Sequence, residues 1–473
     1  MDPQTVSTEK SGTPTPQDLV EHALAASTAD DCIALVRNAT RANLRWANNT
    51  LTTNGSMHDV GMTVISFARS GDGVASASVS GSATSVAQVR GLVEQADAAA
   101  RAGSPAEDAN PLVQGEATTD WAEAPETTSI AVYDAFAPAL GEAFGIAAGA
   151  GRVLYGFVDH EVATTYLGST TGLRLRHVQP TGHYACTGKT ADLSLSAWVG
   201  GATRDFAEVD ALAMEAELAR RLGWGARRVD LPAGRYDTIL PPTAVADLMV
   251  YAYWEAGARV AHEGQSVYSR PGGGTRIGTG IGRRGVHLFS DPAHPGLACA
   301  PYVLARASGN VSSVFDNGLP LGRTEWIRDG TLTALQQTRH SAAMTGQPVT
   351  PAVDNLVLEV EGATQDLPAL VADTERGLLL TCLWYIREVD PQTQLLTGLT
   401  RDGVFLVEGG EITGAVNNFR FNESPVDLLG RFDRSSVTVP ALSREWGDDY
   451  FGRTAMPALR VPGFNMSSVS QAQ

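Results

Sequence analysis

The sequence has few cysteines and no excess of positive charge. Its four cysteines, Cys32, Cys186, Cys299 and Cys382, lie far apart and form no CxxC pair. This usage is typical of a reducing compartment and predicts neither a disulfide framework nor a cysteine-based zinc module. Lys and Arg number 35 against 52 Asp and Glu, so the formal net charge is −17. Because such a charge repels phosphate backbones, we expect no nucleic acid among the partners.

A long apolar run is also missing. The longest one, residues 377–386, has about half the length that a membrane-spanning helix requires. Residues 1–16 contain no basic segment followed by an apolar one, so we expect a flexible polar tail there and no signal peptide. These features predict a soluble, cytoplasmic protein that does not associate with membranes.

The sequence is instead rich in glycine and in β-forming residues. Its 473 residues are too many for one ordinary core, and 49 glycines between short runs of Thr, Val and Ser favour strands with tight turns. We expect an α+β fold. Residues 17–230 alternate helices with antiparallel strands and form an N-terminal α/β domain. Residues 231–473 form a mostly-β C-terminal domain that is entered through one long helix.

Three local patterns in the N-terminal domain give definite expectations. Residues 32–37 and 42–50 predict two paired strands, and Gly71 lies in the turn of a predicted hairpin. Pro138 interrupts a helical pattern at residues 130–148 and should kink or split that helix, because proline removes a backbone donor.

The long helix of the C-terminal domain should begin at Pro242, where the missing N–H of proline costs nothing. Apolar residues then recur at helical spacing. They are Val245, Leu248, Met249, Ala252, Ala256 and Val260. The sequence His262-Glu263-Gly264 follows, and its simplest interpretation is a helix end, with a histidine near the C-terminus and a glycine cap.

No catalytic motif stands out from spacing alone. His160-Glu161 and His262-Glu263 are not followed by a second histidine at zincin spacing, and His287, His294 and Cys299 match no compact zinc module. Residues 280–285, GIGRRG, match GxGxxG formally, but a β-like run follows them where a nucleotide site needs a helix. We therefore predict no catalytic residue and no metal ligand in this chain, and we interpret residues 272–285 as a glycine-rich loop beside a cleft.

Several stretches in fixed order resemble the TldD/PmbA metallopeptidase family. They are FDNGLP (315–320), EWIRDGTLTAL (325–335), NLVLEVEG (355–362), GLLLTCLWYIREVDP (377–391) and TGLTRDGVFLVEGGEITGAVNNFRFNES (397–424). The resemblance covers most of the chain and is clearest after residue 230. It implies an α/β N-terminal part and a mostly-β C-terminal part.

The resemblance also implies which subunit type this chain represents. In TldD-type subunits the long helix carries HExxxH ahead of a Glu-Gly pair, and a cysteine near the C-terminus completes the zinc site. When this chain is aligned on Glu263-Gly264, the positions of the first His, the Glu and the second His hold Glu255, Ala256 and Val260. In a register shifted by one residue, the same three positions hold Trp254, Glu255 and Arg259. Residues 444–464 contain no cysteine. The chain therefore resembles the TldE (PmbA-type) subunit, which lacks zinc ligands.

By this resemblance the chain pairs with a TldD-like subunit that carries the zinc, and it shapes a channel for unfolded or flexible peptides. An extended peptide could add to an exposed strand edge. Candidate channel residues lie at the helix end and in the glycine-rich loop: His262, Glu263, Gly273, Gly280 and Gly282. Two alternatives remain open. One is an autonomous metallopeptidase with a relocated metal site built from His262, Glu263, His287, His294 or Cys299, and the other is a peptide-binding scaffold without proteolytic function.

Overall fold

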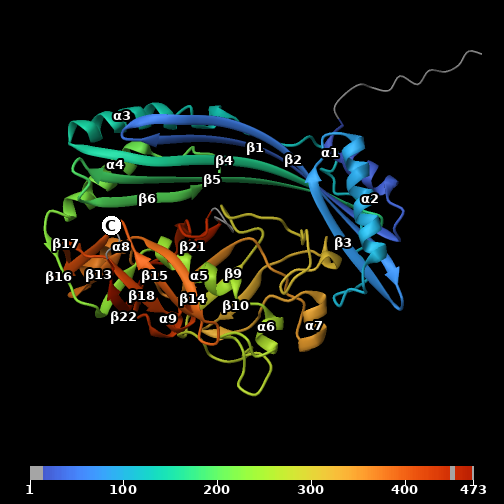
Figure 1. Ribbon diagram of the computed structural model, residues 1–473. Helices are drawn as coiled ribbons and strands as arrows, with labels where there is room; N and C mark the ends of the chain where they lie inside the picture. The colour runs from blue at the N-terminus through green and yellow to red at the C-terminus, as the bar shows by residue number, and fades with distance from the viewer. Residues whose placement is uncertain (1–13, 448–452, 471–473) are drawn as a thin grey trace, which may run out of the picture.

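A computed structural model describes residues 14–447 and 453–470. In Figure 1 a long sheet from the N-terminal half lies over a compact C-terminal body, and the helices of the N-terminal half cover the far side of that sheet. The architecture is mixed α+β with an antiparallel N-terminal sheet, as the sequence pattern predicts, and it contains two further sheets.

The N-terminal sheet has six antiparallel strands in the order β3-β2-β1-β4-β5-β6. The strands are β1 (Asp31–Ala47), β2 (Thr50–Ser70), β3 (Gly73–Ser82), β4 (Arg152–Ser169), β5 (Arg174–Thr190) and β6 (Ser196–Thr203). The predicted hairpin at Gly71 is present, since β2 and β3 pair through a turn at residues 71–72. The prediction of two short paired strands at 32–37 and 42–50 is wrong. These residues lie mostly in the single strand β1, because β2 and β4 pair with β1 on both sides over almost its whole length.

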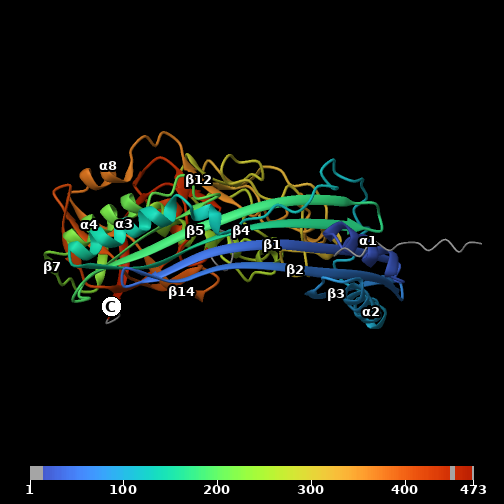
Figure 2. The same ribbon diagram turned by 90° about the horizontal axis from the view of Figure 1, so that it is seen from above.

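One face of this sheet carries the described helices of the N-terminal half, as Figures 1 and 2 show. They are α1 (Pro16–Ala26) and α2 (Val86–Ala102) at one end, and η1 (Ile130–Tyr133), α3 (Phe136–Gly149) and α4 (Ala211–Trp224) at the other. Even-numbered residues of β1 face them: Ala34 is buried against α1 and α2, and Trp46 against α3 and α4. Pro138 does not kink its helix. It lies in the first turn of α3, where its missing N–H has no partner to lose, and the split comes earlier, at residues 134–135.

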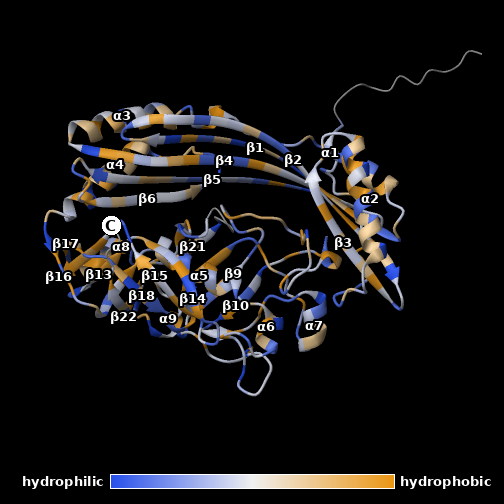
Figure 3. Ribbon diagram, viewed as in Figure 1, coloured by the Kyte–Doolittle hydropathy of each residue, from blue (hydrophilic) through white to orange (hydrophobic). Residues whose placement is uncertain are grey.

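The C-terminal body contains two sheets and the helix α5 (Pro242–Trp254). The smaller sheet has the order β11-β10-β9-β12-β21-β20, and its strands are β9 (Val286–Ser290), β10 (Thr324–Arg328), β11 (Thr331–Leu332), β12 (Leu356–Val360), β20 (Val439–Ala441) and β21 (Thr454–Met456). Leu248 and Met249 of α5 share one buried cluster with residues of both sheets, so this helix joins them in a single core. In Figure 3 apolar and polar segments alternate along the long strands of the N-terminal sheet.

The larger sheet runs β14-β15-β18-β22-β8-β13-β16-β17-β7, with β19 paired to β22. Its strands are β7 (Arg228–Val229), β8 (Gly234–Leu240), β13 (Arg376–Leu380), β14 (Leu383–Asp390), β15 (Leu395–Thr400), β16 (Val404–Glu408), β17 (Glu411–Val416), β18 (Phe419–Glu423), β19 (Arg434–Ser435) and β22 (Leu459–Val469). Short helices connect the strands: α6 (Ala258–His262), η2 (Val314–Asp316), α7 (Arg339–Thr345), α8 (Leu367–Ala372) and α9 (Pro425–Arg431). No helix in the described ranges is long and apolar enough to cross a membrane.

The single long helix predicted after Pro242 is wrong, because the structure has two helices, α5 and α6. Between them Gly257 is extended, with φ −72° and ψ 124°. Gln336 holds this break: its N–H donates to the Ala256 carbonyl (2.8 Å), and its carbonyl accepts from the N–H of Ala258 (2.9 Å). A residue about 80 positions later thus ends the helix by replacing its internal hydrogen bonds.

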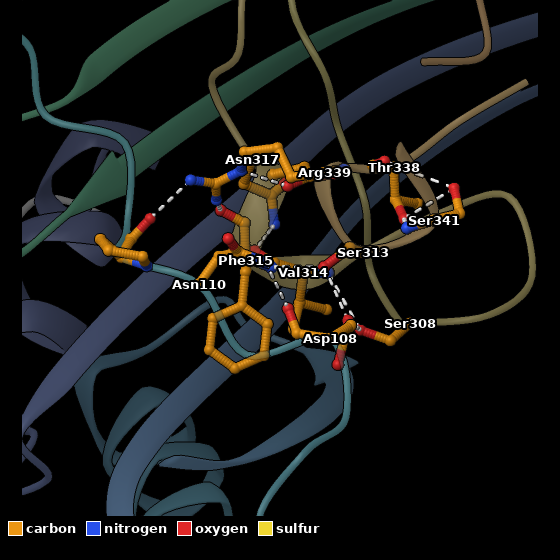
Figure 4. A network of polar contacts seen from close by, with 12 residues as sticks. Asp108, Asn110, Ser308, Ser313, Val314, Phe315, Asn317, Thr338, Arg339 and Ser341 are labelled. Carbon is orange, nitrogen blue, oxygen red and sulfur yellow. Dashed lines mark hydrogen bonds and ion pairs between the residues drawn. The ribbon is translucent and has the colours of Figure 1, made fainter. Parts of the chain in front are cut away.

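The two halves of the chain are joined by a partly buried polar network, shown in Figure 4. Arg339 donates through Nε to the Asp316 carboxylate (2.7 Å) and through Nη1 to the carbonyl of Pro111 in the N-terminal half (2.9 Å). Asp108 accepts hydrogen bonds from Ser308 and Ser313, each at 2.6 Å. The FDNGLP motif, which begins with Phe315, therefore builds the contact between the two domains.

Replacing Arg339 by methionine should destabilise the protein by about 3 kcal/mol, because the carboxylate of Asp316, whose side chain is only 2% exposed, would stay buried without its cation. Urea denaturation of the full chain measures this loss. Arg284→Met is the matched control, since Arg284 is 94% exposed and its surface ion pair should contribute less than about 1 kcal/mol. Equal denaturation midpoints for the two variants would show that the network does not hold the domains.

Candidate functional site

The four positions aligned with metal ligands lie at the break between α5 and α6. Trp254 ends α5, is 37% exposed and packs edge-to-face on Trp446, with ring centroids 5.5 Å apart. Glu255 follows the helix end and is half-buried, while Arg259 and Val260 lie on α6.

Arg259 forms ion pairs in two directions. It binds Glu263 one turn along (Nε to Oε1, 3.1 Å) and Glu107 from the N-terminal half. These contacts raise the pKa of Arg259, with the hydrogen bond to Glu107 contributing most. In one of the two registers, a cation held by two carboxylates therefore occupies the position that the resemblance assigns to a metal-binding histidine.

These residues do not fit the zinc site that the family resemblance implies. A guanidinium repels a dication, and tryptophan and valine offer it no ligand atom, so only Glu255 could contribute one. Within residues 14–447 and 453–470, no three His, Cys, Asp or Glu side chains are grouped to hold a metal.

The remaining predicted metal-type residues have separate partners. His287 pairs with Glu361 (3.2 Å), and His294 contacts the Pro295 carbonyl. Cys299 is buried, which raises the pKa of its thiol to about 12. His160 is a buried structural residue whose ring contacts the Thr128 hydroxyl (2.7 Å) and a backbone carbonyl.

A pair of carboxyl groups lies at the α5 end that the sequence pattern did not indicate. The pKa of Glu255 is raised by burial, and the pKa of Glu388 on β14 is raised by burial and then by the charge of Glu255. Burial and these two charges raise the pKa of the neighbouring Tyr251 to about 12. One carboxylate oxygen of Glu388 is buried without a hydrogen bond to any described residue. Nothing in the sequence near Glu388 links it to Glu255, 133 positions away.

Asp247, in the middle of α5, anchors the segment that carries Trp446. Its carboxylate accepts from the Ser443 hydroxyl (3.0 Å) and the Glu445 N–H (2.9 Å), and its carbonyl accepts from the Trp446 indole (2.9 Å). The Asp247 side chain is fully enclosed, and burial raises its pKa to about 7.

The predicted glycine-rich loop is partly a cavity wall. Gly280 and Gly282 line a pocket of about 880 Å³ together with Arg276, Glu423 and Arg431. Gly273 is not among the residues that line it. His262 and Glu263 lie outside it too, at the end of α6. The substrate-channel role of these five residues stays a prediction.

A second recess, which we call the interdomain groove, lies between the helix-free face of the N-terminal sheet and the C-terminal body. It consists of two adjoining pockets of about 340 and 350 Å³ that share His183. The first is polar and contains the ion pairs Arg37–Glu161 and Arg41–Asp159. The second is aromatic and is lined by Tyr155, Phe157, Trp198 and Trp384, with the Arg444 guanidinium about 5.0 Å from the Trp198 ring and 5.1 Å from the Trp384 ring.

This combination of a helix-covered antiparallel sheet and a two-sheet body is an α+β fold that other solved structures have. Three solved structures share the fold. They are TldE from Thermococcus kodakarensis (16% identity, TM-score 0.74, 95% of this chain and 99% of that chain), and candidate modulators of DNA gyrase from Thermotoga maritima (14%, 0.74, 95% and 99%) and Bacteroides thetaiotaomicron (12%, 0.72, 96% and 98%). None of the curated proteins matches the sequence.

Residues 233–468 match the PmbA/TldA metallopeptidase C-terminal domain. The chain belongs to the PmbA/TldD metallopeptidase family, which confirms the resemblance carried by its sequence motifs.

Asp247→Asn should change how stability depends on pH. Asp247 has a pKa of about 7 in the folded state and an ordinary value of 3.8, so it binds a proton more tightly in the folded protein. Its contribution to the free energy of unfolding therefore falls as pH rises from about 4 to 7, by at most about 1.4 kcal/mol per pH unit. Asparagine keeps the acceptor oxygen and loses this dependence, so the variant should gain stability relative to the natural chain over that window and hold the gain above it. Urea denaturation at several pH values tests this.

Asp72→Asn, at an exposed turn position between β2 and β3, serves as the control. A constant free-energy difference between Asp247→Asn and the natural chain from pH 4 to 8 would contradict the assignment.

Proposed function

We propose that this chain is the non-metal subunit of a TldD/TldE-type peptidase, in which a TldD-like partner carries the zinc. The observation that carries the proposal is the environment of Arg259. This residue lies in a domain of a metallopeptidase family, at a candidate ligand position, and its guanidinium is held by Glu107 and Glu263. A guanidinium has no lone pair to offer a metal ion, and these two ion pairs hold Arg259 at this position, so the position supplies no ligand. The likeness in fold to TldE supports the same assignment.

In this role the chain holds flexible peptides near the zinc of the partner. The interdomain groove supports the proposal, because it combines charged pairs with aromatic walls, and such mixed surfaces bind varied peptide side chains. The glycine-rich loop is a second candidate wall, through Gly280 and Gly282.

Co-expression with a histidine-bearing paralogue from the same genome tests the proposal. We expect the two chains to co-purify in equal amounts and to cleave an unfolded peptide, and we expect a chelator to abolish the cleavage because it removes the zinc of the partner. Stoichiometric zinc and peptidase activity in this chain alone would overturn the assignment in favour of an autonomous enzyme. Recovery of this chain only as a homodimer without activity would favour the scaffold.

One observation favours a second candidate, a hydrolase that uses the carboxyl pair Glu255 and Glu388 as acid and base. Raised pKa values in a carboxyl pair are typical of such sites.

Glu255→Gln separates the two candidates. We expect the peptidase kcat of the assembled complex to stay within about twofold, whereas loss of a general acid or base lowers it by roughly 100-fold or more. Glu388→Gln removes the other carboxyl group of the pair and is tested in the same way. A hundredfold loss in both variants, with the complex still assembled, would place the chemistry in this chain.

A further inference from the structure

Among the described residues, the strand β2 has a neighbour on only one side along half of its length. On one side β1 pairs with residues 50–67, whereas on the other side β3 pairs only with residues 61–70. The chain leaves the sheet at the end of β3, where the N–H of Ala83 donates to the Val60 carbonyl (3.1 Å), and it then forms α2. The row that β3 fills is therefore open beside residues 50–59, and Figure 2 shows β2 at the margin of the sheet.

Residues 50–59, which we call the open half of β2, are also exposed on both faces of the sheet. All of them are exposed except Gly55, which is partly buried, and Leu51 and Met57 are 47% and 58% exposed. None of them belongs to a hydrophobic core cluster of the described chain, whereas Phe67 and its neighbours in the other half of β2 do. A strand with one neighbour and no buried face is only marginally stable in water, so the open half lacks a partner that would complete it.

The open half of β2 has the composition of an interface and not that of a protected edge. From Trp46 to His58 the sequence contains no Asp, Glu, Lys or Arg, although 18% of all residues in the chain are charged. Edge strands that must stay unpaired usually carry lysine or proline, but the open half contains neither, and its single charged residue, Asp59, lies at its end. The centres of protein interfaces are depleted of charge in the same way. The open half is therefore suited to main-chain pairing with another strand.

A folded subunit suits this edge better than a peptide substrate does. None of the residues 50–59 lines any of the three pockets described above, so a peptide bound here would stay in water on both faces. The exposed apolar side chains of the open half point to both sides of the sheet. Leu51 lies opposite Trp46 on the helix-covered side, and Met57 lies opposite Arg41 on the helix-free side. Only a partner that is thicker than a single strand can cover both.

We propose that the open half of β2 pairs, in antiparallel orientation, with the corresponding strand of the zinc-bearing subunit, so that the N-terminal sheet continues into the partner. The fold is shared by the three solved relatives over at least 95% of this chain, so a partner of the same family would present the same half-strand. A two-fold axis between the subunits would then give each half-strand the neighbour that it lacks. This inference rests on the proposed function for the identity of the partner, and it adds the surface through which the two subunits meet.

Hydrogen–deuterium exchange tests the main-chain pairing, by comparison of the purified chain alone with its complex with the zinc-bearing subunit. Alternate residues of an antiparallel strand turn their N–H groups to opposite sides, so about half of the amides at residues 50–59 should exchange freely in the chain alone and become protected in the complex. The strand β1, which has neighbours on both sides, is the internal control and should exchange equally slowly in both samples.

Unchanged exchange at residues 50–59 in an assembled complex would overturn this inference and leave the proposed function standing. Protection of these residues in the chain alone, at concentrations where the chain forms a dimer, would overturn the assignment to the zinc-bearing subunit in favour of a second copy of this chain.

Met57→Lys should raise the dissociation constant of the two subunits by about tenfold or more, because the added strand would remove the lysine charge from water. The thermal unfolding midpoint of the chain alone should not change, since Met57 is 58% exposed. Met344→Lys is the matched control, with the same substitution at a 40% exposed position of α7, and it should assemble like the natural chain.

Assembly of Met57→Lys with the affinity of the natural chain would overturn the inference, and so would an equal loss of affinity in both lysine variants. Failure of the natural chain itself to assemble with a zinc-bearing subunit is a different result, because it would overturn the proposed function together with this inference.

Discussion

The ion pair between Arg339 and Asp316 is the contact on which the rest of the arrangement depends. Asp316 is buried at 1% exposure, so its charge requires a cation, and the same arginine also donates to the Pro111 carbonyl of the other domain. A buried pair of this kind gains little over an apolar contact, but it fixes geometry because its hydrogen bonds are directional. The neighbouring ring of Phe315 packs on Phe67 of the N-terminal sheet, with centroids 4.9 Å apart, and seals this end of the domain contact.

Fixing the domains at one end leaves the interdomain groove open along the rest of the sheet. Apolar residues close the interface around Phe315, whereas further along the strands it is lined by ion pairs of the N-terminal sheet and by aromatic rings from both halves of the chain. Arg259 of α6 also contacts the N-terminal half, because it forms an ion pair with Glu107, in the same segment as Asp108. This ion pair is therefore one more contact between the two halves of the chain.

Much of the fold could be predicted because it depends on local pattern. Pro242 begins α5 as expected, and the hairpin between β2 and β3 follows from alternating residues around Gly71. The motif stretches identify the family, since their order along the chain reflects the C-terminal domain as a whole. The predictions of secondary structure failed where the conformation of a segment depends on the strands that pair with it. The expectation of two strands within β1 failed because β2 and β4 keep the strand extended on both sides, which no window of β1 alone reveals.

The sequence by itself determined the family and the mixed α+β class, and it led to the prediction that Trp254, Glu255, Arg259 and Val260 stand at degenerate metal-site positions. Only the tertiary structure decided that the helix through them breaks at Gly257, because Gln336 replaces its internal hydrogen bonds. Only it brought Glu255 close enough to Glu388 for its charge to raise the pKa of that carboxyl group. The physical reason is common to these cases: burial and charge act through space, between residues that local periodicity cannot connect.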